Sequence, residues 1–248
     1  MRIAVLADIH GNLRALEAVE ANLRRQSPDL IVNLGDHLSG PLEAAEVADL
    51  LVDRAWVHIR GNHDRQLVDR PYEVMGASDR AAHLQLDARH FRWLASLPPT
   101  AEPVPGVLLC HGTPSNDSQY LLEEVRYPDG TVQLAAAQLA GDRLGDSHAR
   151  LVLCGHSHIP RVASLPGGVT VVNPGAVGLP AYNDSFPVPH VMEAGSPHAR
   201  YAVMDFEARG CRVELIAVEY DWNGVAEVAA RAGRPDWARA LATGFALR

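Results

Sequence analysis

Five short segments rich in histidine and aspartate are spread along the first two thirds of this 248-residue chain. They supply seven side chains that can bind transition metals: Asp8, His10, Asp36, Asn62, His111, His156 and His158. Each segment follows a short apolar run that is typical of a buried strand. In an α/β sheet, the carboxyl ends of the strands bring ligands from distant parts of the chain together. The pattern therefore predicts a hydrolytic site with two metal ions.

Taken singly, the segments differ in how strongly they indicate a metal site. Asp8 and His10 leave the same side of an extended chain, but such a pair is common, and Asp36 alone is also typical of a helix cap or turn. In Gly155-His156-Ser157-His158, two imidazoles share one face and the glycine allows close backbone approach. The occurrence of all five segments, each after a strand-like run, favours a metal site over five unrelated turns.

The donor set restricts the metal. Nitrogen and oxygen donors without thiolate suit two divalent ions of Mn, Fe, Zn, Ni or Co, of which we favour Mn. Four imidazoles and two carboxylates are too rich in nitrogen for Ca or Mg. The three cysteines, Cys110, Cys154 and Cys211, have no Cys-x-x-Cys spacing and are too few for a disulfide framework.

Charge and hydropathy exclude several classes of partner. The formal net charge is −8, and the chain has no lysine. A net acidic surface repels nucleic acid and anionic membranes, so we expect a small substrate, no long nucleic acid and no membrane partner. The start, Met1–Asp8, is too short and too soon polar for a signal peptide, which indicates a cytoplasmic location. No pattern predicts the oligomeric state.

Alternating apolar runs and helical stripes predict one α/β domain over residues 1–248. Continuous apolar runs predict buried strands at 3–7, 30–34, 56–59 and 151–154, and paired runs predict hairpins over 161–172 and 201–218. We expect an early, mostly parallel sheet and a late, mostly antiparallel one, with helices on the outer faces.

Two further stretches are candidates for a cap over the site. Residues 112–148 are polar and punctuated by proline and glycine, with one helix expected around 132–140. Residues 180–198 are rich in proline and are expected to form a loop.

Together, the five segments resemble the motif set of the calcineurin-like metallophosphoesterases, in the same order. Asn173-Pro174-Gly175-Ala176-Val177-Gly178 is similar to a loop of the small bacterial and archaeal phosphodiesterase branch. The resemblance implies a four-layer αββα sandwich of two mixed β-sheets flanked by helices. It implies that one ion is bound by Asp8, His10, Asp36 and His158, and the other by Asp36, Asn62, His111 and His156. Asp36 would then bridge the two ions.

The implied activity is hydrolysis of a small phosphodiester or phosphomonoester, by in-line attack of a hydroxide that bridges the two metal ions. His63 is expected to protonate the leaving group, and His63 and Asn62 are expected to contact the phosphate. Asn12 could donate a hydrogen bond to the phosphate as well, or it could simply cap a helix.

One departure from the family pattern concerns the partner of His63. Protein phosphatases of the family carry Gly-Asp-x-x-Asp, whose second aspartate supports the acid histidine. Ser39 stands at that position here, so we do not expect a protein phosphatase, and the partner of His63 is left open. We expect the adjacent Asp64 to point elsewhere.

Two alternative functions stay open beside the phosphoesterase. One is a catalytically silent scaffold of the same fold that binds proteins, and the other is a dinucleoside polyphosphate hydrolase. The complete ligand set argues against the scaffold.

Overall fold

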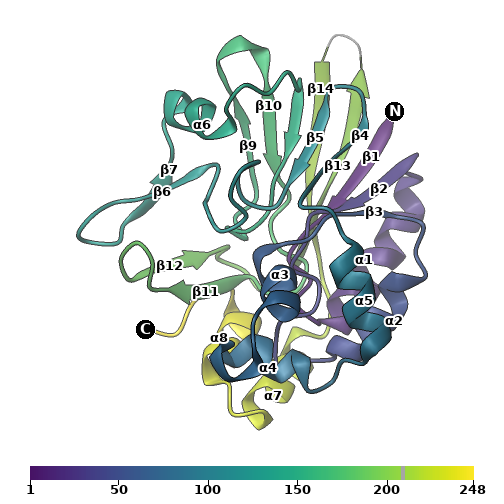
Figure 1. Ribbon diagram of the computed structural model, residues 1–248, viewed down its shortest axis with the longest axis vertical. Helices are drawn as coiled ribbons and strands as arrows, with labels where there is room; N and C mark the ends of the chain where they lie inside the picture. The colour runs from purple at the N-terminus through teal and green to yellow at the C-terminus, as the bar shows by residue number, and fades with distance from the viewer. Residues whose placement is uncertain (208–209) are drawn as a thin grey trace.

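The computed structural model describes residues 1–207 and 210–248. Two five-stranded mixed sheets pack face to face, with helices on their outer faces (Figure 1). The predicted fold class is therefore confirmed. Residues 208–209, within the predicted turn of the last hairpin, lie outside the described residues.

The first sheet joins the beginning of the chain to its end, in the order β14-β13-β1-β2-β3. Its strands are β1 (Arg2–Leu6), β2 (Leu30–Asn33), β3 (Val57–His58), β13 (Ala199–Glu207) and β14 (Gly210–Val218). Strands β1, β2 and β3 are parallel, whereas β13 pairs antiparallel with both β1 and β14. The prediction of separate early and late sheets is wrong, because the second edge of β1 takes the late hairpin as its partner.

The second sheet has the order β4-β5-β8-β10-β9. Its strands are β4 (Thr100–Val104), β5 (Val107–Cys110), β8 (Leu151–Leu153), β9 (Arg161–Ser164) and β10 (Thr170–Asn173). The three central strands are parallel, and the two outer ones are antiparallel to their neighbours.

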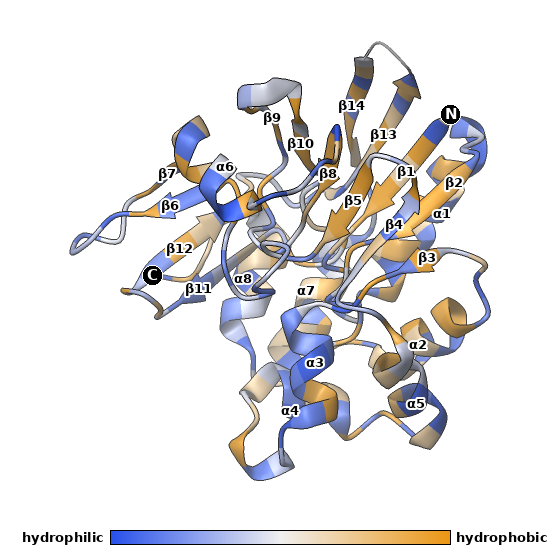
Figure 2. Cartoon of the chain, turned by 45° about the horizontal axis from the view of Figure 1, so that its top comes forward, coloured by the Kyte–Doolittle hydropathy of each residue, from blue (hydrophilic) through white to orange (hydrophobic). Residues whose placement is uncertain are grey.

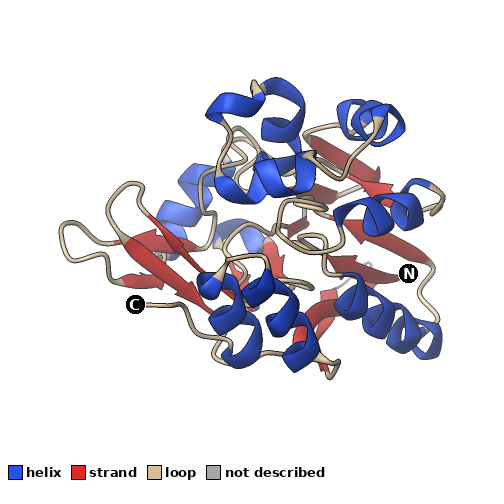
Figure 3. Ribbon diagram, turned by 90° about the horizontal axis from the view of Figure 1, so that it is seen from below, coloured by secondary structure: helices blue, strands red, loops and turns tan. Residues whose placement is uncertain are grey.

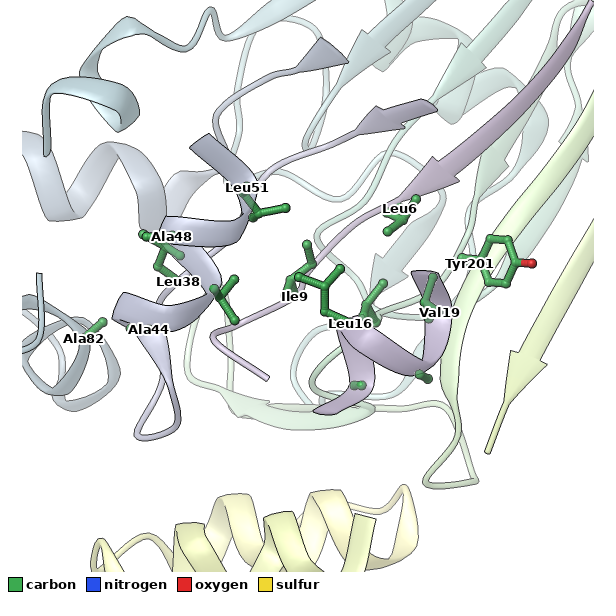
Figure 4. Close-up of a cluster of buried hydrophobic side chains, with 14 of the residues drawn as sticks. Leu6, Ile9, Leu16, Val19, Leu38, Ala44, Ala48, Leu51, Ala82 and Tyr201 are labelled. Atoms are coloured by element: carbon green, nitrogen blue, oxygen red, sulfur yellow. The ribbon is translucent and has the colours of Figure 1, made fainter. Parts of the chain in front are cut away.

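Side-chain alternation along β1 builds two cores. Ile3 and Val5 face the second sheet and pack among residues such as Leu109 and Leu153. Leu6 faces the opposite way, toward the helices α1 (Leu13–Gln26) and α2 (Ala44–Val52). Figure 4 shows Leu6 and Ile9 beside Leu16 and Val19 of α1. Packing on both faces of β1 fixes the orientation of this strand, and so the position of Asp8 and His10 just after it.

The two candidate cap segments contain strands that the sequence did not reveal. Strands β6 (Glu123–Val125) and β7 (Val132–Leu134) form a hairpin that precedes α6 (Ala137–Leu144), so the predicted helix at 132–140 is wrong over its first residues. Strands β11 (Ala181–Asp184) and β12 (His190–Glu193) form a second hairpin where a loop was expected. Its prolines at 187 and 189 lie in the turn, where they remove no ladder hydrogen bond. The two hairpins project from the same side of the molecule (Figures 1 and 3).

The remaining elements are α3 (Asn62–Asp69), η1 (Tyr72–Val74), α4 (Ala77–His83), α5 (Ala88–Ser96), η2 (Pro166–Gly168), α7 (Trp222–Arg231) and α8 (Pro235–Thr243). Three of these helices, α3, α4 and α8, contribute residues to one cavity. Helices α7 and α8 pack on each other, and α8 contacts β11. None of the described helices is long and apolar enough to cross a lipid bilayer.

Candidate metal centre and active site

All seven predicted ligands meet at the carboxyl ends of the strands. They form two groups, Asp8 with His10 and His158, and Asp36 with His111 and His156, and within each group the ligand atoms lie within 4.8 Å of one another. Asn62, the first residue of α3, joins the second group because its Oδ1 lies 3.1 Å from His111 Nε2. Strands from both sheets therefore contribute to one buried cradle.

Asp36 lies between the two groups. Its Oδ2 is 3.2 Å from His111 Nε2 and 4.0 Å from His10 Nε2. His10 Nε2 is in turn 3.2 Å from His158 Nε2. One carboxylate thus reaches both groups, which is the geometry of a bridging ligand.

Three imidazoles are oriented by hydrogen bonds on their outer nitrogen. The Nδ1 atoms of His10, His111 and His158 lie 2.7, 2.8 and 2.6 Å from the carbonyl oxygens of Ser39, Leu34 and Leu179, respectively. A proton on Nδ1 donates to each carbonyl and leaves the lone pair on Nε2 pointing into the cradle. Metal-ligating histidines are typically held in this way.

The backbone is strained at the predicted ligands. Six non-glycine residues in the described part of the chain have positive φ, and five of them are Asp8, His10, Asp36, His156 and His158, at 52° to 68°. Such conformations cost about 1–3 kcal/mol each and persist only where surrounding contacts enforce them. Here, backbone N–H groups of Asp8 and His10 donate to carbonyls of the next strand loop. Strain concentrated at these positions indicates that their side-chain directions matter more than local stability.

Close backbone approach also holds the loops in place. A Cβ on Gly61 would collide with the Asp36 carboxylate, and a Cβ on Gly178 would collide with the carbonyl of Ile9. These glycines let the loops that follow β3 and β10 pack directly on the ligand loops.

The ionisation of the site matches the needs of a cation. Burial raises the pKa of Asp36, but His111 and His63 outweigh it and hold the pKa well below the usual carboxyl value. Burial lowers the pKa of His10 and His156 to about 4, so both imidazoles are neutral. His111 differs from these two. Burial lowers its pKa, but the charges of Asp36 and Asp8 outweigh burial and raise the pKa to about 10. Binding of a cation there would therefore displace a proton from the His111 imidazole.

One buried atom supports a metal at this site. Asp8 Oδ1 is buried and has no hydrogen-bond partner; its nearest imidazole nitrogens are those of His158 at 3.4 Å and His111 at 3.9 Å. An unpaired buried carboxylate oxygen is costly unless a cation compensates it. The donor set, its ionisation and this orphaned oxygen all fit divalent transition-metal ions.

His63 has a partner that sequence reasoning missed. Its Nδ1 lies 2.7 Å from Asp79 Oδ1, and Ser39 Oγ donates to the same oxygen at 2.6 Å. Burial lowers the pKa of His63, but the Asp36 charge and the Asp79 hydrogen bond outweigh it and raise the pKa to about 9. Asp79, only 1% exposed on α4, replaces the carboxylate that Ser39 cannot supply. Asp64 does point elsewhere, since it accepts hydrogen bonds from the backbone N–H groups of Asp36 and Gly61.

A cavity of about 710 Å³ opens over the cradle. Its walls include α3, the β11–β12 hairpin, Trp237 of α8 and Arg234, the N-cap residue of α8. The Trp237 ring lies edge-on to His10 at 5.9 Å, and Arg234 donates to Ser78 Oγ at 3.0 Å, next to Asp79. No sequence motif marked this C-terminal wall.

Comparison with known proteins shows the family of this chain. The family model described as calcineurin-like phosphoesterase superfamily domain matches residues 1–194. The chain belongs to this superfamily. An uncharacterized protein of Methanocaldococcus jannaschii is 26% identical over 95% of this chain and 94% of its own length.

Solved structures extend this likeness over nearly the whole chain. A metallophosphoesterase from Sphaerobacter thermophilus is 26% identical, with a TM-score of 0.74 over 98% of this chain and 99% of its own. A hypothetical protein from Pyrococcus horikoshii OT3, 19% identical with a TM-score of 0.74 over 98% of both chains, shares the fold.

Two tyrosines outside the motifs hold the His156–His158 loop. Tyr120 stacks on His156 with ring centroids 4.8 Å apart, and Tyr182 lies edge-on to His158 at 4.6 Å. Tyr182 Oη donates to the His156 carbonyl at 2.8 Å and lies 3.1 Å from Tyr120 Oη. Because Tyr182 belongs to β11, the hairpin over the cavity is tied to two predicted ligands.

Asn12 has another role in this fold. Its Oδ1 accepts from the backbone N–H of Ala15 and caps α1, while its Nδ2 donates to the carbonyl of Gly178 at 2.9 Å. The side chain is fully buried and does not line the cavity. The capping role is therefore present, and the predicted phosphate contact has no support in this geometry.

Proposed function

We propose that this protein is a metal-dependent phosphoester hydrolase that cleaves a small phosphodiester or phosphomonoester. The observation that carries the proposal is the convergence of seven donors on one cradle, with Asp36 between the two groups. Asp8, His10, Asp36 and His158 would hold one ion, and Asp36, Asn62, His111 and His156 the other. Manganese is the metal that we favour.

Divalent ions held by these residues would supply Lewis-acid chemistry: they would lower the pKa of bound water and offset negative charge on the phosphoryl oxygens. The proton for the leaving group comes from a side chain of the protein. Asp79 and Ser39 engage His63 on Nδ1, which leaves Nε2 for the cavity, where it donates a proton to the departing oxygen. Asn62, the residue before His63, also lines the cavity and would contact the phosphate.

Residues 112–148 and 180–198 act as the cap in this proposal. Ser118 and the residues of β11 line the cavity, and the size of the cavity suits a small organic phosphoester. The cytoplasmic location stays a prediction. A dinucleoside polyphosphate is an alternative substrate, and a metal-free scaffold for protein binding is the alternative in another functional class.

The test is hydrolysis of bis(p-nitrophenyl) phosphate and p-nitrophenyl phosphate by purified protein with Mn, Fe, Zn, Ni or Co. We expect metal-dependent turnover, about two metal ions per chain, and loss of both in Asp36→Asn. The Glu73→Gln variant, which removes an exposed carboxylate on η1, is the control. A metal-replete sample that is inert on every aryl phosphoester would contradict the enzyme, and well under one metal ion per chain would favour the scaffold.

A further inference from the structure

Helix α3 presents a polar stripe that leads away from the metal cradle. Asn62, Gln66 and the C-cap Arg70 are spaced by four residues, so they lie on one face of the helix, and all three line the cavity. The opposite face is anchored because Asp64 and Leu67 are buried. At 1.5 Å per residue, Gln66 lies about 6 Å and Arg70 about 12 Å along the axis from Asn62. Figure 2 shows α3 as one of the most hydrophilic helices.

Arg70 differs from the other arginine in the cavity wall. Arg234 is paired with Asp236 at 2.6 Å and bonded to Ser78. Arg70 is exposed, and its side chain has no ion pair or hydrogen bond with any described residue. The side chain of Gln66 likewise has no hydrogen-bond partner among the described residues. On a protein of net charge −8, this leaves one uncompensated guanidinium facing the cavity.

The acidic residues of the cavity do not neutralise Arg70. None of the acidic residues that line the cavity, Asp36, Asp184 and Asp236, forms an ion pair with Arg70; Asp236 is paired with Arg234 instead. A guanidinium with free donors is suited to a phosphate, which it can bind through two parallel hydrogen bonds.

We propose that Gln66 and Arg70 form a subsite for a second phosphate group of the substrate, one to two helical turns from the scissile phosphate. The substrate class is then a phosphoester that carries a second phosphate several bonds from the first. This proposal rests on the proposed function, since the first phosphate must occupy the metal cradle.

The test compares two non-hydrolysable probes on the manganese-loaded protein by isothermal titration calorimetry. The probes are a straight-chain alkane bisphosphonate and the alkyl monophosphonate of the same chain length. We expect the bisphosphonate to bind about tenfold more tightly, a modest factor because Arg70 is exposed and partly screened by salt. The Arg70→Gln variant should lose this preference, and Arg70→Glu should reverse it.

Arg92→Gln is the matched control, because Arg92 is an exposed arginine on α5 that does not line the cavity. It should keep the tenfold preference, and all variants should keep the wild-type thermal unfolding midpoint. Equal binding of both probes to the wild type, or an unchanged preference in Arg70→Gln, would overturn the subsite alone. Failure of both probes to bind would overturn the proposed function together with the subsite.

Discussion

Replacement of Asp79 by asparagine tests whether the carboxylate acts through His63. The substitution keeps the shape of a side chain that is 1% exposed but removes the charge facing His63 Nδ1 at 2.7 Å. A hydrogen bond between charged groups contributes about 1.5–3 kcal/mol. If that interaction orients the proton donor, kcat/KM falls by about 10- to 150-fold. The decrease in kcat/KM should not exceed that of His63→Ala, which removes the general acid itself and should lower kcat/KM by about 10²- to 10⁴-fold.

The assay is steady-state hydrolysis at saturating manganese, with one series of phosphodiesters whose leaving groups differ in basicity. A p-nitrophenolate leaves without much protonation, whereas an unsubstituted phenolate or an alkoxide needs a proton. The Asp79→Asn loss should therefore grow with the basicity of the leaving group. A purely structural defect would lower turnover equally across the series. Asp69→Asn, an exposed aspartate on α3 outside the cavity wall, is the control.

The double variant decides whether the two residues form one unit. If Asp79 acts only through His63, then His63→Ala combined with Asp79→Asn should be no slower than His63→Ala alone. Additive losses, or an Asp79→Asn enzyme as fast as the wild type on every ester, would refute this reasoning.

Two further predictions concern metal affinity and stability. Tyr182→Phe removes the hydrogen bond to the His156 carbonyl, so manganese affinity should fall about tenfold. Competition with a chelating dye measures this affinity. The control is Tyr127→Phe, at an 84% exposed site, which should leave the affinity unchanged. Burial and His37 lower the pKa of His58 from 6.5 to about 3, so the unfolded state gains a proton first as pH falls below about 6.5. Between pH 7 and pH 5, the free energy of unfolding of the wild type should fall by about 2 kcal/mol more than that of His58→Gln, as measured by urea titration. If the two proteins lose stability in parallel over this range, the lowered pKa of His58 is contradicted.

The convergence of the candidate metal ligands could be predicted from sequence because each candidate segment follows a strand. An apolar run with a donor at its end specifies both a strand and the end at which the donor lies, and parallel pairing then brings these ends together. Asp8, Asp36 and His111 illustrate this, since none needs information beyond a few neighbouring residues.

Asp79 could not be found in this way. It lies sixteen residues after His63, beyond the end of α3 and the break at Gly76, so only the packing of α4 against α3 brings it to the imidazole. The same holds for Trp237, whose position depends on how the last helices fold back over His10. The prediction of which strands share a sheet was wrong for a related reason. Strand β13 pairs with β1, which lies about 200 residues earlier in the sequence, and no local pattern indicates that pairing.

This pairing has a consequence for biosynthesis. The ribosome makes β1, and with it Asp8 and His10, well before β13, so one edge of β1 stays unpaired until Ala199–Glu207 has been made. Domains generally fold as units while the chain is made from its N-terminus. The nascent chain therefore carries these candidate ligands on a strand with one open edge until β13 has emerged, and α8, which lines the cavity, must follow before the pocket is complete.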